Sequence, residues 1–203
     1  MDVVLVALTA FVLILPVELP DKTFVATLVL STRYPPLPVW LGVIAAFAVQ
    51  CLVAVAAGSL ISRLPDGPVA LVAAALFAIG ALVLFRGARR STDADEQEQE
   101  KEYEQKAVDP KHGWRAAGAS FLVLFTAEWG DLSQLLTAGL VARGSNPVAV
   151  FVGSWLALVV VSGLAVLLGR WLLKRVKLSV VRYVAAVVCA VLAVITAVGA
   201  FAG

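Results

Sequence analysis

Charged side chains are scarce in this sequence. Asp, Glu, Lys and Arg make up 15% of its 203 residues, whereas 61% of the residues are hydrophobic and the mean hydropathy is +0.95. Soluble domains usually carry charge on about a quarter of their residues. The composition therefore excludes an ordinary soluble domain and predicts a protein that crosses the lipid bilayer several times. The net charge of +2 gives no indication of a nucleic-acid partner, and none is expected.

Histidine and cysteine are also scarce, with one His and two Cys. Cys51 and Cys189 each lie inside an apolar run, so we expect small hydrophobic residues rather than a disulfide. His112 lies in a polar stretch and is expected to be solvated. The sequence has no Ser/His or Cys/His arrangement and no histidine motif for metal binding. We therefore expect neither an enzyme nor a resident cofactor.

Six apolar stretches approach or exceed the ~20 largely apolar residues that a membrane-spanning helix needs. They cover residues 3–30, 37–61, 68–85, 116–141, 147–168 and 178–201. No basic region precedes the first stretch, so we expect it to remain in the mature protein. The sequence thus predicts an all-α membrane protein with six transmembrane helices.

The two halves of the sequence repeat each other at a single fixed offset. Polar coincidences carry the weight of this comparison, because apolar runs match one another by chance. They pair Glu18 with Glu128, Asp21 with Asp131, Thr23 with Ser133, Thr27 with Thr137, and Arg33 with Arg143. We interpret the chain as two three-helix repeats, 1–86 and 116–203, joined by an acidic linker, 87–115.

Basic residues are distributed unevenly over the two faces of this arrangement. Of the 16 Lys and Arg residues, 13 fall on the side of the linker, Arg63 and Arg143 fall on the other side, and Lys22 lies inside an apolar stretch. Since short loops rich in Lys and Arg stay in the cytoplasm, the linker is predicted to be cytoplasmic and both termini to be outside. In a bacterium the membrane would be the plasma membrane. An odd number of spans in each repeat predicts an inverted repeat, as in many secondary transporters.

Two short motifs place acidic residues inside apolar stretches. They read Glu18-Leu19-Pro20-Asp21-Lys22-Thr23 and Glu128-Trp129-Gly130-Asp131-Leu132-Ser133-Gln134. A carboxylate near the bilayer centre costs about 2.5–3.5 kcal/mol on insertion scales, so it normally faces a partner, a cavity or an ion path. Glu and Asp are three residues apart in each motif and share one helix face. Pro20 and Gly130 are expected to break helices 1 and 4 at the motif.

The two motifs offer only oxygen ligands to a cation. The predicted metal ligands are Glu18, Asp21, Glu128 and Asp131, with Thr23, Ser133, Gln134 and Lys22 in supporting positions. Such a set suits Ca²⁺, Mn²⁺ or Mg²⁺ better than Zn²⁺ or Cu⁺. Four carboxylates exceed the charge of one divalent cation, so protons are expected at the site when metal is absent. Competition between protons and metal is the simplest basis for antiport. Lys22 fits either a structural ion pair with Glu18 or a charge-balancing role.

At these motifs the sequence resembles the Gdt-type cation/proton exchangers (uncharacterised protein family sixteen), which carry two copies of Glu-x-Gly-Asp-(Lys/Arg)-(Thr/Ser). The resemblance covers both repeats and the acidic linker. It implies transport of Ca²⁺ or Mn²⁺ against protons, with the motif acids as ligands, and it points to Lys22, Thr23 and Ser133 beside them. The sequence departs from the motif twice, because Pro20 replaces the first Gly and Leu132 replaces the second basic residue.

Three functions are therefore compared. The first is a secondary active transporter that exports Mn²⁺ or Ca²⁺ from the cytoplasm in exchange for protons by alternating access. The second is an exporter of another cationic solute, such as an amino acid or an amine, since acid pairs also accept an ammonium group. The third is an intramembrane enzyme that uses paired acids. The expected partners are a divalent cation, protons and the lipid bilayer, and the sequence leaves open whether the protein forms a homo-oligomer.

Other residues inside the apolar stretches receive structural interpretations. Gly42 and Gly58 are expected to permit close helix packing. Gln50 is expected to form a hydrogen bond between helices. Trp40, like the other tryptophans outside the motifs, is interpreted as an interfacial anchor or a packing residue. Trp129, inside the second motif, could form a wall of the site.

Overall fold

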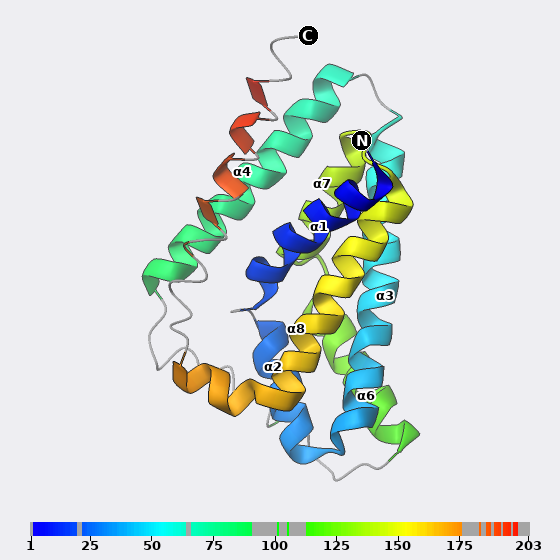
Figure 1. The fold of residues 1–203 in the computed structure, drawn as a ribbon, viewed down its shortest axis with the longest axis vertical. Helices are drawn as coiled ribbons and strands as arrows, with labels where there is room; N and C mark the ends of the chain where they lie inside the picture. Colours follow the sequence, from blue (N-terminus) through cyan, green and yellow to red (C-terminus); the bar gives the residue numbers. More distant parts are fainter. Residues whose placement is uncertain are drawn as a thin grey trace.

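The computed structural model of the chain is built from α-helices (Figure 1). It describes residues 2–19, 22–63, 66–90 and 113–175, together with the positions 101, 105, 183, 186, 187, 189–191, 193–195, 197 and 198. The helices are α1 (Val3–Glu18), α2 (Lys22–Arg33), α3 (Pro36–Ile61), α4 (Asp66–Arg90), α6 (Trp114–Ala127), α7 (Leu132–Ala142) and α8 (Pro147–Arg175). The predicted all-α class is therefore confirmed for the described part of the chain.

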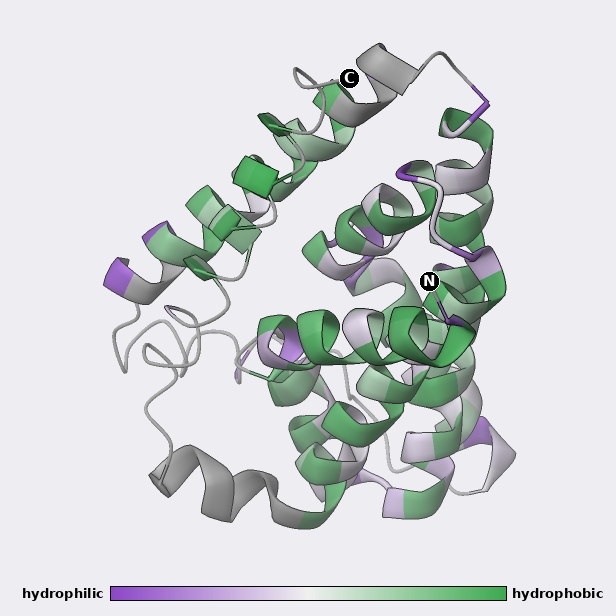
Figure 2. Cartoon of the chain, turned by 45° about the horizontal axis from the view of Figure 1, so that its top comes forward, coloured by the Kyte–Doolittle hydropathy of each residue, from purple (hydrophilic) through white to green (hydrophobic). Residues whose placement is uncertain are grey.

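Two of the described helices are long and apolar enough to cross a membrane. They are α3 and the segment Pro147–Leu167 of α8, each with a hydropathy of 2.4. The pair α1 and α2 gives a third span if it is counted as one helix with a bend of 70°. Apolar residues cover most of the helical surface, while hydrophilic residues gather mainly at helix ends and connections (Figure 2). The count of six spans stays a prediction, since much of the sixth stretch lies outside the described residues.

Both motifs lie where the sequence predicted a break in a helix. The first helix stops at Glu18, and α2 begins at Lys22. In the second half α6 stops at Ala127, and α7 begins at Leu132. Each apolar stretch that carries a motif is therefore divided into two half-helices.

Helices of the first half pack against helices of the second half. The long helix α8 contacts α1, α2 and α3, while α3 also contacts α6 and α7, and α4 packs against α7. Figure 1 shows α8 running between α1 and α3. Glycines permit the closest approaches, because a Cβ at Gly42 would overlap the backbone carbonyl of Ala117, and a Cβ at Gly153 would overlap that of Ala7. Small residues at such crossings let two backbones come together.

Two tryptophans fix the crossing of α3 and α8. The indole nitrogen of Trp40 on α3 donates to the carbonyl of Val159 at 3.4 Å, and the indole nitrogen of Trp155 on α8 donates to the carbonyl of Ile44 at 3.0 Å. A position nearer the start of α3 thus meets a position further along α8, as expected for antiparallel helices. Of the two interpretations of Trp40, the structure supports a packing residue.

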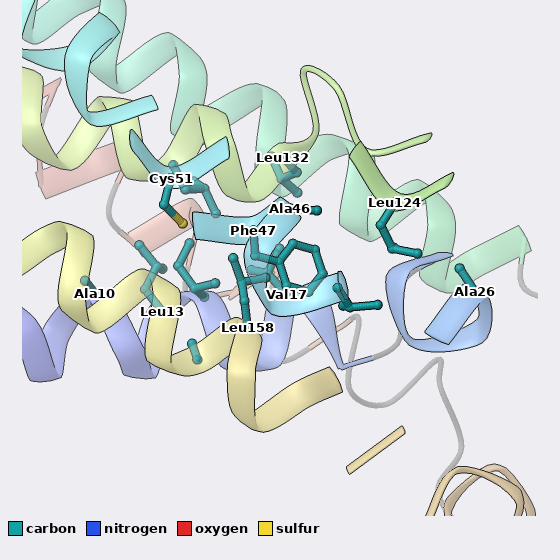
Figure 3. Packing of buried hydrophobic residues seen from close by; sticks show 14 of the residues in the cluster. Ala10, Leu13, Val17, Ala26, Ala46, Phe47, Cys51, Leu124, Leu132 and Leu158 are labelled. Atoms are coloured by element: carbon teal, nitrogen blue, oxygen red, sulfur yellow. The ribbon is translucent and has the colours of Figure 1, made fainter. Parts of the chain in front are cut away.

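The apolar core lies where α1, α3, α7 and α8 meet. Phe47 of α3 is fully enclosed and points toward Val17 of α1 and Leu158 of α8 (Figure 3). Further along the chain, Phe24 of α2 packs against Val161 and Ala165 of α8. This packing holds the half-helices at both breaks against continuous helices.

The described positions of the last apolar stretch lie beside α4. The ring of Tyr183 meets the ring of Phe85 edge to face, with 5.7 Å between the centroids. Cys189 is buried and free, as is Cys51 on α3. Neither cysteine forms a disulfide, in agreement with the expectation from the sequence.

Candidate functional site

Two carboxylates are buried at the carboxyl-terminal ends of helices. Glu18 is the last residue of α1 and is 1% exposed, and Glu128 directly follows α6 and is 3% exposed. The carboxyl end of a helix carries a partial negative charge, which favours a cation and disfavours an anion. Transporters use such half-helix ends to coordinate cations. Both positions therefore favour a cation beside the carboxylate.

Asp131 plays a different role from these two acids. It caps the amino end of α7, where its Oδ2 accepts a hydrogen bond from the backbone N–H of Ser133 at 3.3 Å. Its side chain is partly exposed. An ionised carboxylate has about four lone-pair positions, so one capping bond leaves room for a cation. The cap holds Asp131 in place at the start of the half-helix.

Gly130 makes the turn between α6 and α7. Its φ is +78°, in the left-handed region that favours glycine. The space around it is open, since no atom lies within 4 Å of the place where a Cβ would stand. The requirement for glycine here therefore comes from the backbone conformation alone. The equivalent position in the first motif, Pro20, lies outside the described residues.

The side chain of Gln134 bridges the second break. Its Nε2 donates to the carbonyl of Glu128 at 2.8 Å, and its Oε1 accepts from the N–H of Gly130 at 3.2 Å. The same carbonyl also accepts from the N–H of Asp131 at 3.2 Å. The amide predicted as a supporting ligand is thus engaged with backbone groups of the break. The offset that pairs the two motifs places Gln134 on Phe24, so apolar packing replaces the amide bridge in the first half.

One turn of α3 faces both breaks. The Nε2 of buried Gln50 donates to the carbonyl of Phe125, in the last turn of α6, at 3.2 Å. One turn earlier on α3, the ring of Phe47 points toward Val17, the residue before Glu18 at the end of α1 (Figure 3). The ends of α1 and α6 therefore lie near the same level of α3. The expected hydrogen bond of Gln50 between helices is confirmed.

Only part of the predicted ligand set lies in the described structure. Asp21 and the side chain of Lys22 lie outside it, whereas the supporting residues Thr23 and Ser133 are buried at the starts of α2 and α7. Within the described ranges, no group of three or more His, Cys, Asp or Glu is placed to hold a metal ion. Convergence of all four acids on one site therefore stays a prediction.

Leu132 and Trp129, the other side chains of the second motif, have apolar neighbours. Leu132, which replaces the basic residue of the motif, is buried against Gly80 of α4. The ring of Trp129 is 58% exposed and meets the ring of Phe125 edge to face at 5.0 Å. The structure therefore gives no support to Trp129 as a wall of the site.

A buried hydrogen bond close to α7 was not expected from the sequence. The hydroxyl of Thr137 on α7 donates to the Oγ of Ser154 on α8 at 3.1 Å, and both side chains are buried. The match of Thr27 with Thr137 was the available signal, because a threonine kept at the same register of both half-helices indicates a shared structural position. Nothing in the sequence selected Ser154.

Comparisons with known proteins identify a family whose sequence model matches both halves of the chain. The sequence model of the family described as "Divalent cation/proton antiporter GDT1" matches residues 6–92 and 116–203. GDT1-like protein sll0615 of Synechocystis sp. is 32% identical over 180 residues, which are 85% of this chain and 87% of the relative. GDT1-like protein 3 of Arabidopsis thaliana is 30% identical over 83% of this chain and 62% of its own length. No solved structure matches the chain.

Proposed function

The chain belongs to the GDT1 family of divalent cation/proton antiporters, and on that premise we propose that it exports Mn²⁺ or Ca²⁺ from the cytoplasm in exchange for protons. The observation that carries this proposal is the placement of Glu18 and Glu128. Each is buried at the carboxyl end of a half-helix, and one turn of α3, from Phe47 to Gln50, packs against Val17 of α1 and bonds to Phe125 of α6. The proposed ligands are these two acids with Asp21 and Asp131, supported by Thr23 and Ser133.

The choice of cation follows from the ligand atoms. Carboxylate and hydroxyl oxygens are hard ligands that suit Ca²⁺ and Mn²⁺, whereas Zn²⁺ and Cu⁺ favour nitrogen and sulfur. Among the described residues, the soft side chains are the buried thiols of Cys51 and Cys189. A thiol of this kind becomes a metal ligand only as the thiolate. We therefore propose that the oxygen ligands select the cation.

Coupling to protons follows from the burial of the acids. Without metal, burial and the negative end of the helix both favour the protonated carboxyl group. A divalent cation that binds must displace those protons, because it needs ionised ligands. Metal and protons then occupy the site in turn, which is the requirement for an exchanger.

We further propose that the chain is an inverted repeat of two three-helix units, 1–86 and 116–203. Reciprocal packing supports this, since α1 lies on α8 as α6 lies on α3. The close contacts of Gly153 with Ala7 and of Gly42 with Ala117 are also reciprocal, and the offset between the motifs pairs these two alanines with each other. The same family model matches each half of the chain separately. Rocking of one unit against the other around the breaks would give alternating access.

The proposed orientation places the linker in the cytoplasm and both termini outside. It rests on the distribution of Lys and Arg in the sequence. With this orientation, α2 and α6 border the path to the cytoplasm, and α1 and α7 border the path to the outside. Labelling of single cysteines placed in the linker and near the amino terminus tests it, since only the second should react with an impermeant reagent added outside intact cells.

The function is tested with purified protein in liposomes that contain a pH-sensitive dye. A gradient of Mn²⁺ or Ca²⁺ should drive protons the opposite way, and competition between the ions should rank their affinities. Glu128→Gln and Asp131→Asn should abolish the exchange and leave insertion intact, because removing an intramembrane charge relieves a cost. Flux of an amine or amino acid without metal dependence would instead support the second candidate function. Normal exchange by Asp131→Asn would remove that residue from the ligand set.

A further inference from the structure

Thr27 on α2 has a buried hydroxyl that makes no hydrogen bond within the part of the chain that the structure describes. Its side chain is 0% exposed, and its Oγ1 has no hydrogen-bond partner there. Hydroxyls on helices commonly bond to a carbonyl one turn earlier. Ser31 does so on the same helix, donating to the carbonyl of Leu28 at 2.7 Å. Thr27 therefore lacks the hydrogen bond within its own helix that Ser31 makes.

The equivalent residue in the second half shows where such a hydroxyl points. Thr137 holds the same register as Thr27 in the repeat, and its hydroxyl bonds outside its own helix. It donates to Ser154 of α8, next to the contact of Gly153 with Ala7. At this register the hydroxyl faces the neighbouring long helix.

Ser120 on α6 has a second buried hydroxyl, and α6 contacts the helix α2 that carries Thr27. It is 0% exposed, and its Oγ also lacks a hydrogen-bond partner among the described residues. Ala117, almost one turn earlier on α6, packs against Gly42 near the start of α3. The helix α2 contacts both α3 and α6. The helices that carry Thr27 and Ser120 therefore contact each other, and both contact α3.

The surroundings of Thr27 and Thr137 differ in which helix carries the second hydroxyl. Around Thr137 the partner of the threonine hydroxyl is Ser154, and the position equivalent to Ser120 is the buried Ala10. Around Thr27 the second hydroxyl is instead on Ser120 of α6. The position equivalent to Ser154 is Ile44 when the two motifs are aligned. It is Val43 when Gly153 is aligned with Gly42, which makes the equivalent close contact. Among the described residues, the hydroxyls of Thr137 and Ser154 are thus bonded to each other, whereas those of Thr27 and Ser120 have no hydrogen bond.

We propose that Thr27 and Ser120 form an intermediate cation-binding position, here called the hydroxyl station. It binds a divalent cation that keeps part of its hydration shell. The cation passes it between the acids and the end of the molecule where α2 ends and α6 begins. Hydroxyl and water oxygens are ligands for such cations. Thr27 lies one helical turn beyond Thr23 of the first motif, so the station continues the oxygen ligands along α2. The bond between Thr137 and Ser154 closes the corresponding place toward the opposite end. This inference rests on the proposed function, because it assigns a path to the exchanged cation.

The test compares the double variant Thr27→Val and Ser120→Ala with the wild type, using Mn²⁺ as the probe. Valine keeps the shape of threonine and removes only the hydroxyl. Ser31→Ala is the matched control, because it removes a hydroxyl of α2 that is bonded to its own helix. Exchange is measured in liposomes, and association of Mn²⁺ with detergent-solubilised protein is followed by stopped-flow tryptophan fluorescence, with affinity from Mn²⁺ electron paramagnetic resonance.

The double variant should show exchange and Mn²⁺ association slowed about tenfold, as for the loss of two weak polar contacts at a barrier, with an unchanged equilibrium affinity. The control should match the wild type. Wild-type rates in a folded double variant would overturn the station and leave the proposed function intact. If Mn²⁺ associates more slowly with the double variant and the wild type shows no exchange, the station is supported and the antiport is refuted. A wild type that binds no Mn²⁺ would overturn both.

Discussion

At the scale of single residues, the acids of this chain differ in what holds them. Glu18 and Glu128 are buried at the negative ends of half-helices, whereas Asp131 is partly exposed and caps a positive end. The same chemical group therefore has two roles here. The buried glutamates lie at helix ends that favour a cation, and the aspartate is oriented by a backbone bond from Ser133.

Gly130 allows a prediction at this scale. Gly130→Ala should destabilise the folded protein by about 1–2 kcal/mol, because an L side chain is strained at its φ of +78°. No clash contributes, since the space for a Cβ is empty. Thermal unfolding of the protein in detergent, followed by circular dichroism, measures the change.

The control is Gly118→Ala on α6, where a Cβ also meets nothing within 4 Å and φ is not positive. Alanine in a helix interior is more favourable than glycine by roughly 0.5–1 kcal/mol, so this variant should be slightly more stable. If the two variants have equal stability, the turn does not depend on the left-handed conformation.

At the scale of elements, the two breaks occur at equivalent positions of the repeat but are stabilised by different interactions. Gln134 ties α7 to the end of α6 through two backbone groups, while the equivalent Phe24 packs α2 onto α8. Hydrogen bonds fix direction and distance, whereas apolar contacts tolerate sliding. We therefore expect the second break to keep its shape during transport and the first break to change more.

This difference gives a prediction for Gln134→Leu. The variant keeps side-chain volume and leaves the carbonyl of Glu128 and the N–H of Gly130 without their amide partner, so the free energy of unfolding should fall by about 1–3 kcal/mol. The pH profile of exchange should also shift, because Glu128 is no longer held in one place. A variant with lower stability and an unchanged pH profile would mean that Gln134 is purely structural. Gln134→Glu retains an acceptor for the N–H of Gly130 but has no donor for the carbonyl of Glu128 and adds a third acid at the break, so it should not restore the stability.

At the scale of the whole molecule, the arrangement is reciprocal. Each broken helix packs on the long helix of the other half, and the long helices cross each other with tryptophans bonded in both directions. Motion of one half therefore moves the neighbours of both breaks. This provides a physical route by which a cation at one break affects the other.

The whole-molecule prediction is that the two motifs share one cation. A structure determined with Mn²⁺ should place carboxylate oxygens of both Glu18 and Glu128 within ligand distance of the ion, about 2.0–2.6 Å for hard cations. Anomalous scattering from Mn²⁺ would locate it. Motifs separated by more than ~12 Å with apolar packing between them would refute a shared site, since this exceeds ligand reach several-fold.

The sequence alone determined the class of the protein, its duplicated motifs and the places where helices break. Composition and long apolar stretches decide membrane insertion, and glycine or proline decides local backbone freedom, so these properties are local and can be derived from residue order. The motif acids Glu18, Glu128 and Asp131 were found this way, and so was the family. The number of spans stays a prediction.

The tertiary structure decided which side chains meet. Gln134 was predicted as a supporting ligand and instead bridges backbone groups, Leu132 fills a space beside Gly80, and Ser154 receives the hydroxyl of Thr137. In an apolar helix nearly every face has a similar composition, so periodicity does not reveal how the helix is rotated against its neighbours. Only packing fixes that rotation, and with it which hydroxyls are paired and which have no hydrogen bond among the described residues.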